Sequence, residues 1–318
     1  MKITPIEEIK KLNIQPVISV GMFDGVHSGH QKLLSILLEK AKAYNTLAAV
    51  VTFSNHPRFV LDYNLNCKPV LLLQTYEERM KSLSHFGIKN VYTIDFSERI
   101  SKLSPAIFLD FIIEKLNPYL LLMGYDNSFG NKKDSDLANI LHNGKYQSMA
   151  IKKTDACVFY NGLEVSSTQI RNALKEGNIK LANIMLNYFY TLSGKVIKGY
   201  KKGRGLGFPT ANLKVDALKL IPKCGVYAVH VVINKRILEG VMFIGERKTF
   251  DLNDLTIEVH IFNFNTDIYN KNIEVQLVDF IREQQRFASV EDLIQQIKND
   301  CEYAKQIFKL NSDNPFNL

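Results

Sequence analysis

The chain has 318 residues, of which 46% are hydrophobic and 23% are charged, an ordinary globular composition with enough length for two domains. Its formal net charge of +8 and pI near 9.1 favour anionic partners. Lysine and arginine are spread along the chain, which contains no long basic block. We therefore expect small phosphorylated ligands as partners and no nucleic acid.

The four cysteines, Cys67, Cys157, Cys224 and Cys301, are widely separated and show no CxxC pair or zinc spacing. This pattern is typical of reduced cysteines. The N-terminal MKITPIEEIKKLN lacks the apolar segment of a signal peptide. No apolar run approaches the roughly 18 residues that a membrane helix needs. We expect a cytoplasmic protein that does not contact a membrane.

The first half of the chain alternates strand patterns with helix patterns. A helix that begins at Thr75 has a capping box with Glu78 and ends at Gly87. The alternation predicts an α/β domain with a doubly wound parallel sheet, in which ligands bind beyond the carboxyl ends of the strands. Strands are predicted over 16–21, 47–54, 90–96 and 119–126, and helices over 29–44, 75–87 and 104–118.

The pattern changes near residue 188, after a last helix over 178–187. Five short strand patterns follow with Gly, Asn and Lys turns between them, and a final helix over 289–308 is capped by Ser289. This order predicts an antiparallel barrel or sandwich closed by a C-terminal helix. We place the domain boundary between residues 186 and 187, which gives domains 1–186 and 187–318.

The segment GMFDGVHSGH, residues 21–30, links the first strand to the first helix. A helix N-terminus presents unpaired N–H groups, and glycines let a phosphate approach the backbone closely. His27 and His30 are three residues apart, so both imidazoles can face one polyphosphate during displacement at phosphorus. Two histidines at this spacing also occur in metal sites, but no third ligand lies nearby in sequence.

Three later segments follow predicted strands and carry groups that can bind phosphate. VTFSNHPR supplies His56, Pro57 and Arg58, and MGYDNSFGNKK supplies Asp126. EVSSTQIRNAL opens a second helix, where Ser166 and Gln169 read as a capping box and Arg171 offers a fork of N–H donors.

These motifs resemble the HxGH nucleotidyltransferase family, specifically the adenylyltransferase half of bifunctional riboflavin kinase/FAD synthetases. The resemblance implies that FMN attacks the α-phosphorus of ATP with Mg²⁺ present, giving FAD and pyrophosphate. It also implies catalytic roles for His27, His30 and Arg171. ATP contacts would be made by Gly21, Phe23, Asp24, Gly29, Ser166, Ser167 and Thr168, and FMN contacts by His56, Pro57, Arg58 and Asp126.

The stretch KGYKKGRGLGFPTANL begins the β-rich half, and no Walker A pattern occurs in the chain. Its glycines and lysines suit a flap over phosphates. The Thr210 hydroxyl and the Asn212 amide oxygen are hard ligands of the kind that Mg²⁺ prefers. Read alone, the stretch fits a basic hairpin loop equally well.

GRGLGFPTAN, followed by GVYAV, IEVHIF, DIYN and FIREQQRF, resembles the riboflavin kinase family, whose fold is a six-stranded barrel with a terminal helix. The resemblance implies that Glu258 is the catalytic carboxylate, which can accept the proton of the ribityl hydroxyl. It places Mg²⁺ at Thr210 and Asn212. It places ATP at Lys202, Gly203, Gly207 and Pro209, and the flavin at Arg282 and Phe287.

The chain departs from these family patterns at several positions. In the first half, Ser54, Asn55, Asn127 and Gln169 differ from the usual residues. In the second half the departures are Phe243, Lys248, Asn263 and Asn270. They leave an alternative open, in which the chain only adenylylates FMN and the barrel is a degenerate flavin-binding module. A non-enzymatic nucleotide or RNA binder is a third reading, and we expect a monomer or weak homo-oligomer.

Overall fold

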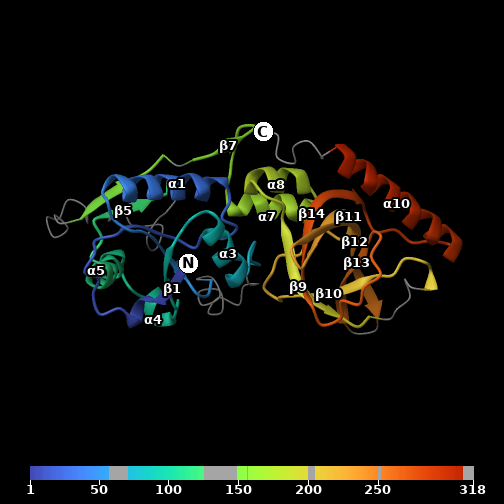
Figure 1. Cartoon of the computed structure of the whole chain (residues 1–318), viewed down its shortest axis with the longest axis horizontal. Helices are drawn as coiled ribbons and strands as arrows, with labels where there is room; N and C mark the ends of the chain where they lie inside the picture. Colours follow the sequence, from blue (N-terminus) through green and yellow to red (C-terminus); the bar gives the residue numbers. More distant parts are fainter. Residues whose placement is uncertain (57–70, 125–148, 156, 200–204, 250–251, 311–318) are drawn as a thin grey trace. The chain divides into compact units, whose positions relative to one another are not determined.

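A computed structural model describes residues 1–56, 71–124, 149–155, 157–199, 205–249 and 252–310, without the side chains of 246–249 and 252–254. The chain forms two compact units, Met1–Val165 and Ser166–Leu318, which are described here one at a time. Figure 1 labels their elements.

The first unit contains a six-stranded sheet in which every neighbouring pair is parallel. The strand order is β1-β4-β3-β2-β5-β6, so the direction of winding reverses at β2, between β3 and β5. Apolar residues fill the central strands, as expected for strands buried on both faces. The strands are β1 (Lys2–Pro5), β2 (Val17–Val20), β3 (Ala48–Phe53), β4 (Asn90–Ile94), β5 (Leu120–Met123) and β6 (Ala150–Lys153).

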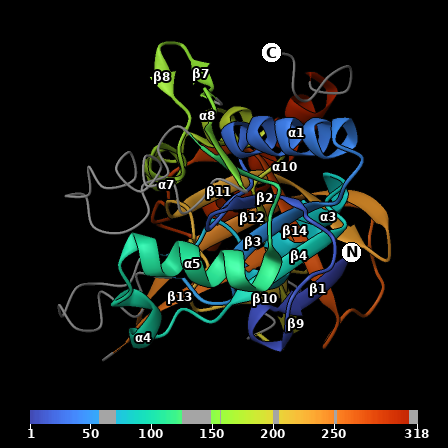
Figure 2. The same ribbon diagram turned by 90° about the vertical axis from the view of Figure 1, so that its left-hand side faces the viewer.

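Helices cover both faces of this sheet (Figure 2). On one face, Leu34 and Leu37 of α1 pack with Leu83 of α3 against alternate strand residues. On the other face, Leu109 and Ile112 of α5 pack against the remaining strand residues. The helices are α1 (Ser28–Ala43), α3 (Tyr76–His85), α4 (Glu98–Ser101) and α5 (Pro105–Leu116), with a 3₁₀ turn η1 (Ile6–Glu8). The doubly wound parallel sheet predicted from the sequence is confirmed.

Local sequence signals set the ends of these helices. The Thr75 hydroxyl accepts from the Glu78 N–H and the Glu78 carboxylate accepts from the Thr75 N–H, which confirms the predicted capping box. Gly87 follows α3 with φ of 99°, a conformation that favours glycine. Ser104 caps α5, whose first residue is Pro105.

The second unit contains a closed antiparallel barrel of six strands in the cyclic order β10-β13-β12-β11-β14-β9. Of the barrel and the sandwich that the sequence left open, the barrel is the one formed. Closure pairs β9 with both β10 and β14, so the barrel has no unpaired edge strand. The strands are β9 (Thr191–Ile197), β10 (Ala211–Val215), β11 (Gly225–Ile233), β12 (Arg236–Thr249), β13 (Leu252–Ile261) and β14 (Asn272–Arg282).

Three helices pack on this barrel. The terminal helix α10 (Val290–Leu310) buries Ala304, Ile307 and Phe308 against the barrel wall, and the Ser289 hydroxyl caps it by accepting from the Asp292 N–H. The helices α7 (Ser167–Glu176) and α8 (Ile179–Leu186) also belong to this unit. Packing therefore divides the chain after Val165, whereas the division of function between residues 186 and 187 stays a prediction.

Four strands or strand pairs were missed by the sequence reading. They are β1, β6, β10 and the two-stranded hairpin of β7 (Phe159–Tyr160) and β8 (Leu163–Glu164). The hairpin turn is Asn161-Gly162 with φ of 49° and 78°, and an Asn-Gly pair is a recognisable turn signal. The strands β1 and β6 are mostly exposed, so they lack the apolar pattern that revealed the others.

Candidate functional site

The loop of residues 21–27 leaves β2 at the point where the winding of the sheet reverses. Ligands of open α/β sheets bind at this kind of position. The loop leads directly into α1, which begins at Ser28, one residue before the predicted start at residue 29. The N–H groups of Ser28 and Gly29 lie in the first turn and have no hydrogen-bond partner in the described part of the chain. The loop therefore has the geometry of an anion site.

The two histidines of this loop are stacked on each other. The ring centroids of His27 and His30 lie 3.7 Å apart with an interplanar angle of 23°. His27 is the N-cap of α1, and its Nδ1 accepts from the His30 N–H over 3.4 Å. Because Nδ1 accepts this bond, the proton of this ring is placed on Nε2. A Cβ at Gly29 would lie 3.3 Å from the His27 ring, so glycine makes room for the stack.

His30 is held in its neutral form. Burial lowers the pKa of His30 well below its ordinary value, and the nearby charges of His27 and Arg79 lower it further. Its Nδ1 is buried and has no hydrogen-bond partner among the described residues. The ring of Phe23 packs against His30 at 5.2 Å, and a Cβ at Gly21 would lie 3.2 Å from the Phe23 ring. Phe23 thus packs beneath the His30 ring, and glycine at position 21 leaves room for the Phe23 ring.

Asp24 and Arg79 hold this loop in place from behind. The Asp24 carboxylate accepts from the N–H groups of Leu73 and Gln74, both at 3.1 Å. Arg79 is 1% exposed and donates to the Phe53 carbonyl oxygen at the end of β3. Burial lowers the pKa of Arg79 to about 10, against the opposing effect of Asp24. Sequence reasoning missed Arg79, because nothing in its helix pattern marks an arginine that points inward.

The remaining residues predicted for FMN lie mostly outside the described chain. His56 is partly buried just after β3, and Pro57, Arg58 and Asp126 are outside the described residues. Asn55, which stands where the family usually has proline, exchanges two hydrogen bonds with the Phe96 backbone at 2.7 and 3.0 Å. This side chain therefore ties the end of β3 to the segment after β4, which explains how the position accepts asparagine.

The second predicted phosphate motif lies at the start of α7, in the second unit. The Ser166 hydroxyl accepts from the Gln169 N–H over 3.3 Å, so the Ser166 half of the predicted capping box is present. Ser167, Thr168 and Arg171 occupy the first turns of the same helix. Because the histidines belong to the first unit, the meeting of Arg171 with His27 and His30 stays a prediction.

Within the second unit, a cavity of about 910 Å³ lies among β10, β12, β13 and α10. This volume is at the upper end of the range for small-molecule sites. Its apolar lining includes Phe208, Phe243 and Ile297. The structure brings together five residues that the sequence singled out, since the cavity is lined by Thr210, Asn212, Glu258, Arg282 and Phe287.

Three of these residues form an oxygen-rich group at the β10–β13 pairing. The Thr210 hydroxyl donates to the Glu258 carboxylate over 3.2 Å, and Asn212 is paired with Glu258 in register. A Cβ at Gly199 would overlap the Asn212 amide, so glycine is required for the amide to lie there. In the described chain, no group of three or more His, Cys, Asp or Glu residues could hold a metal. Hydroxyl, amide and carboxylate oxygens together are a donor set that fits Mg²⁺.

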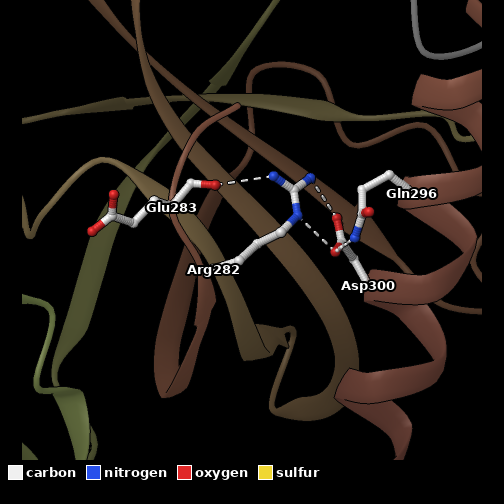
Figure 3. Close-up of polar contacts among 4 residues, drawn as sticks. All are labelled: Arg282, Glu283, Gln296 and Asp300. Atoms are coloured by element: carbon white, nitrogen blue, oxygen red, sulfur yellow. Dashed lines mark hydrogen bonds and ion pairs between the residues drawn. The ribbon is translucent and has the colours of Figure 1, made fainter. Parts of the chain in front are cut away.

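Arg282 and Phe287 line the same cavity, together with Asp300 of α10. The Arg282 guanidinium forms two bonds of 2.8 Å with the Asp300 carboxylate of α10 (Figure 3). It also lies 5.8 Å from the Phe287 ring. Sequence reasoning missed Asp300, because an acidic residue inside a helical pattern normally faces solvent.

The other predicted kinase-site residues lie elsewhere or outside the described chain. Pro209 lines a separate cavity of about 430 Å³, which shares Thr210 with the larger one. Gly207 has φ of 86°, a conformation that favours glycine. Lys202 and Gly203 are outside the described residues.

Two of the departures from the kinase pattern have a conformational explanation. Asn263 and Asn270 have φ of 52° and 63°, and asparagine tolerates this left-handed region better than other residues with a side chain. Asn270 can therefore replace a glycine there without altering the turn. Phe243 faces the cavity, where it contributes apolar surface in place of the amide of the family's asparagine. The side chain of Lys248 is not described.

No helix in the described ranges is both long enough and apolar enough to cross a bilayer. Comparison with known proteins gives two matches to family models. A model described as FAD synthetase matches residues 9–169, and one described as riboflavin kinase matches residues 186–308.

Several relatives share the architecture of the entire chain. Those named bifunctional riboflavin kinase/FMN adenylyltransferase include proteins from Listeria monocytogenes (36% identity over 96% of both chains) and Bacillus subtilis (32% over 94% of this chain and 95% of the relative). A solved structure titled as a macrolide-efflux protein from Streptococcus pneumoniae has a TM-score of 0.84 and 30% identity, covering 96% of this chain and 99% of its own. The relatives and both family matches agree, and this chain belongs to the family of bifunctional riboflavin kinase/FMN adenylyltransferases.

Proposed function

We propose that the barrel phosphorylates riboflavin to FMN, that the α/β unit transfers an adenylyl group to FMN to give FAD, and that ATP is the co-substrate of both reactions. One observation carries the proposal. Each family match contains one pair of candidate residues that the structure brings together, the stacked His27 and His30 in one and the bonded Thr210 and Glu258 in the other.

In the kinase reaction, the terminal ribityl hydroxyl oxygen attacks the γ-phosphorus of ATP. The new bond joins that oxygen to phosphorus, the bond to the bridging oxygen breaks, and ADP leaves. Glu258 accepts the hydroxyl proton, while the Thr210 hydroxyl bonded to it at 3.2 Å fixes the direction of the carboxylate. Arg282 and Phe287 hold the flavin in the same cavity.

Thr210 and Asn212, beside Glu258, are the residues that would hold Mg²⁺. When bound, the ion would neutralise charge on the phosphates of ATP. The chain's own contribution is to place the hydroxyl and amide oxygens close to Glu258, through the β10–β13 register and the space left by Gly199.

In the adenylyl transfer, an oxygen of the FMN phosphate attacks the α-phosphorus of ATP and pyrophosphate leaves. Both histidines act as N–H donors to the phosphoryl oxygens, where negative charge increases in the transition state, and His30 does so in its neutral form. Burial disfavours a charged His30 and the nearby Arg79 guanidinium would repel it, so both effects lower the pKa of His30. The first turn of α1 adds backbone donors, and Arg171 with the α7 N-terminus is proposed to hold the phosphates from the other side.

The test is to incubate the purified chain with riboflavin, ATP and Mg²⁺ and to separate the flavins by HPLC. We expect both FMN and FAD. Formation of neither product would reject the proposal. FAD made from supplied FMN, without FMN made from riboflavin, would select the alternative in which the barrel only binds flavin.

Two variants test the separation of the sites. His30→Ala should lower FAD formation by about 10²- to 10³-fold, the usual effect of losing one transition-state donor, with FMN formation unchanged. Asn212→Ala should have the reverse effect. The control is the exposed His85, which lies on α3, and His85→Ala should leave both activities unchanged. Loss of both activities in a folded variant would contradict separate sites.

The cytoplasmic location and the monomer or weak homo-oligomer predicted from the sequence stay proposals. Sedimentation of the purified chain over a range of concentrations tests the second. A stable oligomer at nanomolar concentration would contradict it.

A further inference from the structure

An ion pair between a partly buried guanidinium and a buried carboxylate joins the end of β14 to the terminal helix. Arg282 Nε and one terminal nitrogen each donate over 2.8 Å to the two oxygens of Asp300, which is 3% exposed. The Gln296 amide donates to the same carboxylate over 2.9 Å (Figure 3). Asp300 therefore accepts three N–H groups, and its charge is directed at Arg282.

The guanidinium is held on its remaining sides as well. Its other terminal nitrogen donates to the Glu283 carbonyl oxygen over 3.0 Å, and its plane lies near the Phe287 ring. Arginine has five N–H groups. Three of them are used among the described residues, so two remain to donate to a ligand.

Stability alone is a weak reason for such a pair. Removing two charges from water offsets much of their attraction, and well-packed apolar residues often stabilise a fold equally well. A bidentate pair does fix the direction of the guanidinium, however. Arg282 and Asp300 line both the 910 Å³ cavity and an outer groove of about 460 Å³, so the pair forms part of the wall between them.

We propose that Asp300, supported by Gln296, is a positioning residue of the kinase site, which orients Arg282 so that its two remaining N–H groups bind the ring of the flavin. Because Asp300 balances the charge of Arg282, the wall presents directed N–H donors with little net charge. Such donors suit the uncharged carbonyl and ring-nitrogen acceptors of a flavin better than a triphosphate. The inference rests on the kinase activity proposed above.

Asp300→Asn is the decisive variant, because it keeps the shape of the side chain and removes its charge. We expect the KM for riboflavin to rise by about 10- to 100-fold, as for a misplaced binding group, with little change in kcat or in the KM for ATP. Riboflavin binding without ATP, measured by quenching of flavin fluorescence, should weaken by the same factor. An unchanged riboflavin KM, or an equal rise in the ATP KM, would overturn the proposal.

A double-variant test separates positioning from a purely structural role. If Asp300 acts through Arg282, then Asp300→Asn should add little to the riboflavin KM in an Arg282→Gln background. Fully additive effects would overturn the proposal. Gln296→Ala, a milder change on the same helix, should raise the riboflavin KM by a few-fold in the same direction, so the idea is still tested if Asp300→Asn folds poorly.

Two controls accompany these variants. Lys298→Gln removes a charge from an exposed position of the same helix and should leave the riboflavin KM unchanged. Conversion of FMN to FAD by the same chain should also be unchanged, which reports that the variant is folded. If the wild-type chain makes no FMN at all, the kinase proposal fails, whereas a kinase that is indifferent to Asp300→Asn refutes only the positioning role.

Discussion

Asparagine occupies most of the left-handed backbone positions that are not glycine. Of the ten such residues in the described chain, seven are Asn, including Asn117 and Asn187, which end α5 and α8. Phe23 and Val26 are exceptions, with φ of 52° and 36°, and both lie in the loop before His27. A β-branched residue in this region is strained. Strain of this kind concentrates at binding sites, where the surrounding structure maintains it.

The turn at Asn270 gives a prediction for stability. Asn270→Ala should lower the free energy of unfolding of the second unit by about 1–2 kcal/mol, because alanine lacks the local polar contacts that ease a left-handed conformation. Asn270→Gly should be nearly neutral. Urea denaturation of the two variants measures the difference. Equal losses for both would show that the side chain, not the backbone conformation, matters.

The pKa of His30 gives a prediction for pH dependence. A histidine with a lowered folded pKa binds fewer protons than it does when unfolded, so the stability of the first unit should fall as pH drops below about 6.5. The contribution of one such group is at most about 1.4 kcal/mol per pH unit. His30→Gln should flatten this slope between pH 5 and 7, measured as melting temperature by circular dichroism. His85→Gln, at an exposed position, should retain the wild-type slope.

At the scale of elements, a buried polar side chain joins α8 to the barrel. Asn183 is 4% exposed, donates to the Leu277 carbonyl oxygen over 2.9 Å and accepts from the Tyr190 N–H over 2.7 Å. It thus bridges α8, the first residues before β9, and β14. The Lys180–Asp279 ion pair joins the same two elements from the surface, where the lysine side chain is 66% exposed.

Asn183→Ala should destabilise the second unit by about 1–3 kcal/mol for each backbone group left without a partner. Lys180→Gln, on the same helix, should cost less than about 1 kcal/mol, because exposed ion pairs contribute little. The two variants can be compared by their urea midpoints, followed through kinase activity. A larger loss for Lys180→Gln would contradict this ranking.

The elements that sequence predicted well are those whose causes are local. The Thr75–Glu78 capping box and the cap at Ser289 each depend on residues close together in sequence, and the start of α1 was predicted to within one residue. Arg79 and Asp300 were missed because their partners are distant in sequence. Asp24 was predicted only as an ATP contact, and its bonds to the backbone near residue 73 depend on tertiary folding. Local sequence patterns therefore predicted the motifs, whereas the residues that support these motifs could be identified only from the structure.

At the scale of the whole molecule, each unit has a hydrophobic core of its own. Leu37 of α1 and Val229 of β11 are both fully buried, one in each unit. Because the cores are separate, we expect a substitution that destabilises one unit to reduce first the activity assigned to that unit. A bifunctional chain offers a direct test, since each activity reports on its own fold.

Leu37→Ala should cost the first unit about 2–5 kcal/mol. For a unit of this length, each kcal/mol of lost stability lowers the melting temperature by about 2–4 °C. The temperature that halves FAD formation from FMN should fall accordingly, while that for FMN formation should not change. Val229→Ala should show the opposite pattern. A parallel fall of both activities in either variant would show that the two units unfold together.

The two sheets differ in how they meet solvent and other chains. The closed barrel offers no strand to which another chain could add, whereas the open sheet ends at β1 and β6 in the described part of the chain. Lys2 and Pro5 lie on β1, and Lys152 and Lys153 lie on β6. Lysine and proline on outer strands discourage edge-to-edge aggregation. The risk of edge-to-edge pairing during synthesis is thus concentrated in the N-terminal half, which emerges first from the ribosome. The lysine and proline residues on the outer strands of that half reduce this risk.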